Sequence, residues 1–247
     1  MKVPAVVAHR GLARLYPENT MASVLGAYDA GLGYVEIDIQ LTQDGVPVLQ
    51  HDSDLKRMTG RGGDLRRKPY AKLKALHMSE PGRFGRRFRS EGLATLAELA
   101  QVLSLRSFGT LFVELKEESL KHFGRALMLE AVAEALGPIH RRCVLISFDV
   151  AVLRLARETT RFSLAPVLRS LGQWRGAELR SLRWDWVFCD RRLLPKNGPL
   201  KTFFGPSRLC VYEVPEVAVA RGLLSRGASA VETFRADCLA EELALFV

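Results

Sequence analysis

Eight residues with acidic, basic or imidazole side chains lie within or directly after four short apolar runs in the first half of the sequence. They are His9, Arg10, Glu36, Asp38, His51, Asp52, Glu114 and Lys116. A single histidine or a single Glu-x-Asp pair in such a place is usually a structural or solvated feature. Four consecutive runs that carry such residues are hard to explain in that way, so the pattern indicates one functional site.

The carboxylates of this group suit a hard cation. Glu36 and Asp38 are two residues apart in an alternating apolar run, so both side chains project from one face of an expected strand. Crowded carboxylates raise each other's pKa unless a cation lies between them. With Glu114 they offer three oxygen ligands and no sulfur, which suits Mg²⁺ or Ca²⁺ better than zinc.

The other members of the group suit chemistry on a phosphate ester. His9 and His51 are two of five histidines in the chain, and imidazoles give and take protons near neutral pH. Arg10 offers a planar fork and Lys116 a point charge, and both fit a phosphate. Two acid–base groups, a cation site and two positive charges together predict an enzyme that acts on phosphate esters.

Short apolar runs alternate with longer helical patterns through most of the chain, which is typical of parallel βα units. The expected strands cover residues 5–8, 34–40, 46–50, 110–115, 143–148, 163–168, 186–189, 209–214 and 230–233. These nine runs are one more than a (β/α)₈ barrel needs, and the sequence leaves open which is the extra one. We predict an α/β fold with a single domain over residues 1–247, a TIM (β/α)₈ barrel. An open doubly wound sheet is the alternative.

The clearest helical patterns cover residues 20–30, 95–103, 120–136 and 150–158. Asn19 and Thr20 are the expected capping residues of the first helix, because short polar side chains satisfy the free amides of a helix start. The eight acidic, basic and imidazole residues named at the start lie before these helical patterns or in the segments that connect them. A barrel would therefore gather them at the carboxyl ends of its strands, where barrel enzymes place their chemistry.

The net charge of +9 comes from one segment. Residues 56–89 contain twelve lysines and arginines against two acidic residues, and several glycines and prolines make the segment mostly loop. We expect an insertion over about 56–93 at the catalytic rim. It is either a solvated surface or a positive funnel that attracts anionic substrates and weakly contacts an anionic membrane surface. A third hypothesis, nucleic-acid binding, is not favoured.

Composition excludes several other classes of protein. The chain is 48% hydrophobic and 26% charged, which excludes a disordered or low-complexity chain. Its apolar runs are far shorter than the ~20 residues of a spanning helix, and no signal-peptide pattern precedes His9. We therefore expect a cytoplasmic protein. The four cysteines form no Cys-x-x-Cys pair and are expected to be buried, reduced thiols.

The sequence resembles the glycerophosphodiester phosphodiesterases of the compact bacterial type, and the resemblance extends over nearly the whole chain. The motifs that carry it are Ala8-His9-Arg10-Gly11, Pro17-Glu18-Asn19-Thr20, Glu36-Ile37-Asp38, Thr42-Gln43-Asp44-Gly45, His51-Asp52, Arg57-Met58-Thr59, Thr95-Leu96-Ala97-Glu98, Glu114-Leu115-Lys116 and Ser147-Phe148. The resemblance implies a TIM barrel with a small insertion after the third strand. It also implies hydrolysis of small-molecule glycerophosphodiesters to glycerol 3-phosphate and an alcohol, with one divalent cation, Mg²⁺ or Ca²⁺.

The resemblance also implies roles for individual residues. The metal ligands would be Glu36, Asp38 and Glu114, the acid–base pair His9 and His51, and the phosphate-binding residues Arg10 and Lys116. Glu18 would sit beside the substrate, and Tyr212 would line the glycerol or alcohol pocket. The resemblance leaves open which histidine is the acid and whether water attacks directly or a cyclic phosphate forms first.

The carboxyl-terminal part departs from the family pattern. Tyr212-Glu213-Val214-Pro215 stands where the family often has an aromatic residue followed by Thr-Val-Asn, and Thr233-Phe234 stands where a Thr-Asp pair is usual. These changes leave substrate choice open. A lysophospholipase D-type phosphodiesterase on the same scaffold is the closest alternative function. A catalytically inactive phosphate-binding barrel is disfavoured because the histidines and carboxylates are all present.

Overall fold

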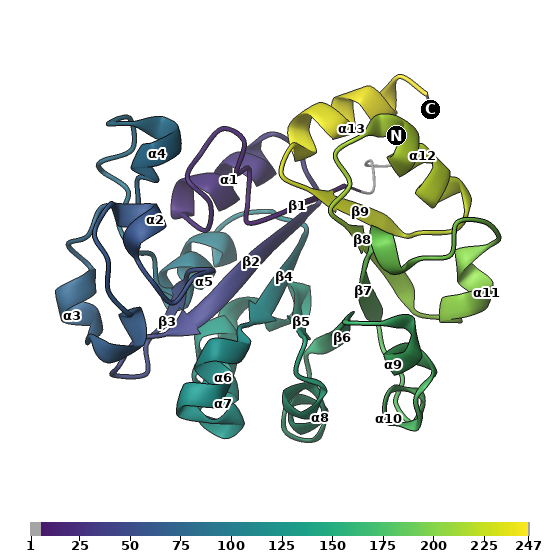
Figure 1. Cartoon of the computed structure of the whole chain (residues 1–247). Helices are drawn as coiled ribbons and strands as arrows, with labels where there is room; N and C mark the ends of the chain where they lie inside the picture. Colours follow the sequence, from purple (N-terminus) through teal and green to yellow (C-terminus); the bar gives the residue numbers. More distant parts are fainter. Residues whose placement is uncertain (1–5, 247) are drawn as a thin grey trace.

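Eight runs of apolar, largely β-branched residues form parallel strands that close into a barrel (Figure 1) in the computed structural model, which describes residues 6–246. The barrel strands are β1 (Val6–Ala8), β2 (Tyr34–Leu41), β4 (Thr110–Leu115), β5 (Cys143–Ser147), β6 (Ser163–Leu168), β7 (Trp186–Asp190), β8 (Arg208–Tyr212) and β9 (Ala230–Thr233). β1 pairs with both β2 and β9, and these two pairings close the barrel. The predicted TIM barrel is confirmed. Residue 5 of the expected first strand lies outside the described residues.

The extra strand is β3 (Pro47–Leu49), which pairs antiparallel with the end of β2. The tight turn at Asp44–Gly45 reverses the chain, so β3 runs back along β2 toward the barrel mouth. The sequence pattern predicts that His51 ends a barrel strand. This prediction is wrong, because β3 is not one of the eight barrel strands. His51 is returned to the mouth by a hairpin, and the amide of Gln50 still donates to the carbonyl of Asp38 over 3.0 Å.

Helices surround the barrel and connect its strands (Figure 1). They are α1 (Met21–Asp29), α5 (Leu96–Ser104), α6 (Glu117–Phe123), α7 (Arg125–Leu136), α8 (Val150–Thr159), α9 (Leu171–Arg175), α10 (Ala177–Arg180), α11 (Leu200–Phe204), α12 (Val217–Ser225) and α13 (Ala236–Ala244). The single helix expected over 120–136 is wrong: α6 and α7 are separate, because Gly124 between them has a φ of 88°, which helices do not adopt. In the part of the chain that the structure describes, every helix is too short or too polar to span a bilayer.

Side chains that point into the barrel form a core distinct from the one between barrel and helices. Phe112 lies at the centre of the inner core, where its ring meets Trp186 and Phe188 edge to face at centroid distances of 5.1 and 5.0 Å. These aromatic rings fill the barrel below the mouth and make a floor for it. The four cysteines are free, and all but Cys238 are buried.

The insertion after β3 folds as short helices around a small apolar cluster of its own. These helices are α2 (Lys56–Thr59), α3 (Tyr70–Leu73) and α4 (Pro81–Phe84), with a 3₁₀ turn at Leu65–Arg67. Val48 of β3, Met58 of α2 and Leu73 of α3 are buried in this cluster. The cluster anchors the insertion to the β2–β3 hairpin, on the side of the molecule where α1 lies (Figure 1).

Candidate active site

A cavity of about 180 Å³ opens at the carboxyl ends of the barrel strands. Its polar lining residues are His9, Arg10, Glu36, Asp38, His51, Glu114, Lys116 and Glu232, and its apolar wall is Ile146, Phe148, Val167, Phe188 and Tyr212. The fold therefore brings together all the residues predicted for the site except Asp52, which lies against His51, and Glu18. The Glu18 carboxylate lies behind Arg10 and does not line the cavity.

Two neighbouring strands position the three predicted metal ligands. Asp38 of β2 and Glu114 of β4 are register partners, and Glu36 lies two residues earlier on the same face of β2. Each of the three offers an oxygen, and these atoms all lie within 4.8 Å of one another. The second oxygen, Oε1, of Glu36 is buried without a hydrogen-bond partner. An all-oxygen donor set with an unsatisfied buried acceptor fits one hard divalent cation.

Positive side chains lie against one side of this carboxylate group. Lys116 Nζ is 3.3 Å from Asp38 Oδ1 and 3.0 Å from Glu114 Oε1. Arg10 Nε is 3.2 Å from Asp38 Oδ2. Burial would raise the pKa of Asp38, but Lys116 and Arg10 outweigh it and lower that pKa below its usual value.

On the opposite side of the carboxylate group, at Glu36, positive charge does not offset the effect of burial on the pKa. Burial raises the pKa of Glu36 well above its usual value, and the nearby carboxylates of Asp38, Glu232 and Glu114 raise it further. Burial also raises the pKa of Glu114, although Lys116 opposes the change. Among these carboxyl groups, Glu36 is thus the one whose ionised form an added positive charge would stabilise most.

Asn19 supports Asp38 and does not cap α1, so that part of the capping expectation is wrong. Thr20 is the cap and accepts a hydrogen bond from the amide of Ser23. Asn19 adopts a φ of 52°, which asparagine tolerates better than most residues. This conformation lets its side-chain amide donate to Asp38 Oδ2 over 2.9 Å, while Oδ1 accepts the Asp38 amide over 3.0 Å.

Each histidine of the cavity is held by a carboxylate at Nδ1. His9 Nδ1 lies 2.9 Å from Glu213 Oε2, and His51 Nδ1 lies 2.6 Å from Asp52 Oδ1. An ionised carboxylate can only accept, so Nδ1 carries the proton in both contacts. His9 Nε2 then faces the carboxylate group, 3.9 Å from Glu36 Oε2.

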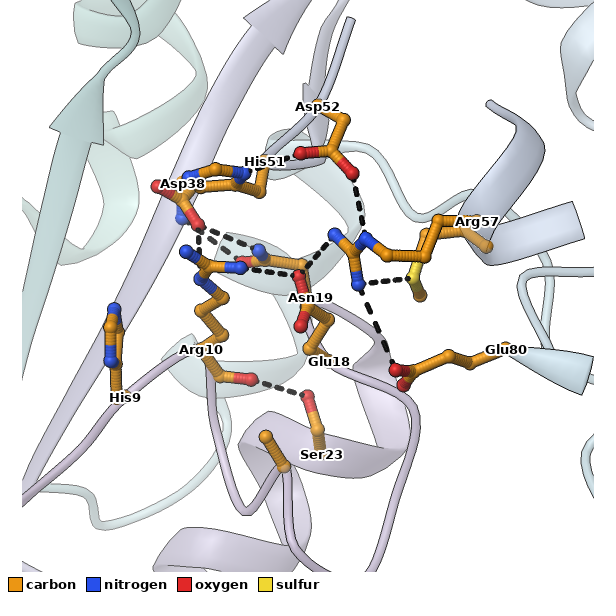
Figure 2. A network of polar contacts seen from close by, with 12 residues as sticks. His9, Arg10, Glu18, Asn19, Ser23, Asp38, His51, Asp52, Arg57 and Glu80 are labelled. Atoms are coloured by element: carbon orange, nitrogen blue, oxygen red, sulfur yellow. Dashed lines mark hydrogen bonds and ion pairs between the residues drawn. The ribbon is translucent and has the colours of Figure 1, made fainter. Parts of the chain in front are cut away.

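Arg57 of α2 joins the insertion to Asp52, which holds His51, and to Glu18, which holds Arg10 (Figure 2). Its guanidinium donates to Asp52 Oδ2 and to Glu18 Oε1, each over 2.7 Å. Arg10 Nη1 donates to the same Glu18 oxygen over 2.8 Å. Arg57 thus supports His51 through Asp52 and orients Arg10 through Glu18. The sequence places Arg57 in a family motif but gives it no role.

Sequence reasoning missed Glu232, which is only 3% exposed and lines the cavity. Burial raises its pKa to about 7, and its Oε1 has no hydrogen-bond partner. Alternation along the strand is the signal that could have identified it. Ala230 faces the inner core, so Glu232, two positions later on β9, must face inward too. A charged residue in an inward position near a strand end marks a functional site.

Comparison with known proteins shows the family to which the chain belongs. The model of the glycerophosphoryl diester phosphodiesterase family matches residues 9–192 of the 247. The chain belongs to this family. Glycerophosphodiester phosphodiesterase 1 of Mus musculus is 37% identical over 112 residues, which are 45% of this chain and 34% of that protein. Glycerophosphodiester phosphodiesterase of Caldanaerobacter subterraneus is 30% identical over 150 residues, 60% of each chain.

Solved structures extend the similarity over the whole fold. A phosphodiesterase from Oleispira antarctica in complex with the product sn-glycerol-3-phosphate superposes with a TM-score of 0.86 at 25% identity, over 98% of this chain and 97% of that one. A structure from Silicibacter pomeroyi gives 0.81 at 22% identity, over 99% and 94%, and supports the fold. The chain spans less than two thirds of the length of the curated relatives above.

We expect Arg57→Ala to lower the free energy of unfolding by about 1–3 kcal/mol at pH 7, because the buried Glu18 loses a charged partner. Burial would raise the pKa of Glu18, but Arg57 and Arg10 lower it below its usual value. A lowered pKa stabilises the fold above the unfolded-state pKa, and this stabilisation is lost as the pH falls through the folded-state pKa. The deficit should therefore shrink below about pH 4.

Urea unfolding at neutral and acid pH measures this effect. Arg86→Ala is the matched control, since Arg86 is exposed and forms no ion pair among residues 6–246. It should leave stability unchanged at both pH values. A deficit of equal size at both would mean that Arg57 acts by packing and not by pairing with carboxylates.

Proposed function

We propose that this protein hydrolyses glycerophosphodiesters to glycerol 3-phosphate and an alcohol, with one divalent cation, Mg²⁺ or Ca²⁺. The observation that carries the proposal is the convergence of two carboxylate-backed histidines on a group of three carboxylates. A binding protein for phosphate would need the positive charges but not this paired acid–base apparatus. Family membership and the product named for the Oleispira antarctica structure support the same reaction.

Each residue has a role in this proposal. Glu36, Asp38 and Glu114 hold the cation, which when bound supplies charge neutralisation at a phosphoryl oxygen. Arg10 and Lys116 bind the phosphate oxygens, and Glu18 and Asn19 keep Arg10 and Asp38 in place. One histidine accepts the proton of the attacking hydroxyl, and the other gives a proton to the leaving alkoxide.

The cavity size bears on the substrate. A volume of about 180 Å³ is below the ~300–1,000 Å³ usual for ligand pockets and suits the glycerol phosphate part of a diester. The alcohol must then extend toward the mouth, past the half-buried rings of Tyr212 and Phe148. These rings are an apolar wall that would also accept the acyl chain on the glycerol of a lysophospholipid, which keeps the lysophospholipase D-type activity as the second candidate.

An assay for the released phosphomonoester tests the function: glycerol 3-phosphate from glycerophosphocholine and glycerophosphoethanolamine, and lysophosphatidic acid from lysophosphatidylcholine. We expect activity on the first two to be lost on exhaustive chelation and restored by Mg²⁺ or Ca²⁺, because three converging carboxylates repel one another without a cation. Full activity after chelation would exclude the cation site. Release of lysophosphatidic acid from lysophosphatidylcholine, without hydrolysis of the other two substrates, would favour the second candidate.

His9→Ala and His51→Ala should each lower kcat at least ~10²-fold, the usual contribution of one general acid or base. The double variant should lose far less than the product of the two losses, because groups that act as a unit are not additive. Steady-state kinetics on a diester with a poor leaving group measures both effects. A single variant with near-normal kcat would make that histidine structural.

The basic insertion guides anionic diesters to the cavity in this proposal. The ring of Phe88 lies 5.8 Å from that of Tyr16, two residues before Glu18, so the insertion borders the site. Arg83 is a tether, because it pairs with Glu80 and donates to the carbonyl of Ala13. Arg86, Arg87 and Arg89 are exposed, form no ion pair in the described part of the chain, and lie in the same part of the insertion as Phe88, so they are left to act on solutes.

Replacing Arg86, Arg87 and Arg89 together by glutamine should lower kcat/KM at low salt and leave kcat unchanged. Exposed charges act over a Debye length of about 8 Å at physiological salt, so they affect encounter and not chemistry. The salt dependence of kcat/KM should flatten in the variant. Profiles that overlay would mean that the segment is only a solvated surface.

A control for this variant comes from the opposite end of the barrel. Arg141, Arg161 and Arg183 are exposed and directly precede the strands β5, β6 and β7, far from the carboxyl ends where the cavity lies. Their triple glutamine variant removes the same charge and should keep the wild-type salt profile. Equal changes in both variants would indicate an effect of net charge alone.

A further inference from the structure

The carboxyl-terminal loops hold His9 on three sides. Glu213, directly after β8, receives the hydrogen bond from Nδ1. The ring of Phe234, directly after β9, stacks on the imidazole with a centroid distance of 4.2 Å and an interplanar angle of 21°. The backbone amide of His9 donates to the carbonyl of Thr233 over 3.2 Å. The edge, the face and the backbone of His9 are thus all fixed by residues outside the segment 9–192 that matches the family model.

The Glu213 carboxylate is itself oriented. Its second oxygen, Oε1, accepts the backbone amide of Phe234 over 2.9 Å. A backbone amide is an obligatory donor, so this oxygen must remain an acceptor. Oε2 is then directed at His9 Nδ1, and the same loop that supplies the stacking ring fixes the carboxylate.

We propose that Glu213 is a positioning residue for His9: it holds the proton on Nδ1 and thereby keeps Nε2, which faces the carboxylate group, as the atom that exchanges protons with the substrate. This inference rests on the proposed function. Glu213 itself touches neither substrate nor reacting atoms. Its effect is exerted through the tautomer and orientation of the ring.

The glutamine variant separates this role from packing. Glu213→Gln keeps the shape of the side chain but offers one acceptor and one donor group. Its carbonyl oxygen must accept the Phe234 amide, which leaves the NH₂ group facing His9 Nδ1. Nδ1 then has to accept, and the proton moves to Nε2. The variant therefore keeps the fold and presents the wrong tautomer to the substrate.

We expect Glu213→Gln and Glu213→Ala each to lower kcat by about 10–100-fold, the usual effect of losing the partner of a functional histidine, with KM nearly unchanged. In a His9→Ala background, either change should have almost no further effect, because the residue it acts through is gone. Glu216→Ala is the control: Glu216 is exposed on the same loop and pairs with Arg191 outside the cavity. It should keep wild-type kinetics.

¹⁵N-edited NMR of the imidazoles tests the proposal without any activity, with His9 assigned by its absence from His9→Ala. The full-length wild type should show neutral His9 protonated at Nδ1, and Glu213→Gln should show it protonated at Nε2. An unchanged tautomer in Glu213→Gln, or an equal loss of kcat with and without His9, would overturn the proposal. If the wild type released no glycerol 3-phosphate, the proposed function would fail, while the NMR result would still decide the role of Glu213.

Discussion

Carboxylates buried side by side repel one another, and this repulsion is the constraint on which the rest of the site depends. Glu36 and Asp38 are each 2% exposed and share a face of β2 with no room to separate. In a medium of low dielectric constant such a pair is stable only with positive charge close by. Arg10 and Lys116 supply it at Asp38, so the uncompensated charge is concentrated at Glu36, on the side that His9 Nε2 faces.

The two histidines of the cavity are held by different parts of the fold. His9 directly follows the first barrel strand, and its position follows from barrel closure. His51 is delivered by the antiparallel return of β3, and Asp52 and Arg57 hold it from the side of the insertion. Local opening of the insertion would therefore displace His51 first, whereas His9 would move only with the barrel. This difference follows from topology, because a strand paired on both sides opens less readily than a hairpin end.

Much of the barrel and of its mouth follows from local sequence patterns. Alternation of apolar residues predicts the strands, and polar groups at their ends predict most of the cavity. The extra strand was not identified because an apolar run looks the same in either direction. The turn at Asp44–Gly45 was the usable signal, since a tight turn joins antiparallel strands. The break at Gly124 and the turn of Asn19 toward Asp38 depend on single backbone conformations that periodicity does not encode.

The contacts of Glu213 and Phe234 could not be predicted for a different reason. Glu213 and His9 are 204 residues apart, and only the pairing of β1 with β9, which in turn pairs with β8, brings them together. In the sequence both residues are departures from a motif, and a departure by itself only leaves substrate choice open. In the fold, Glu213 and the ring of Phe234 lie apart from the carboxylate group of Glu36, Asp38 and Glu114 and instead enclose the imidazole of His9. Variation in the loops after β8 and β9 can thus tune proton transfer at His9 while the carboxylates of β2 and β4 stay in place.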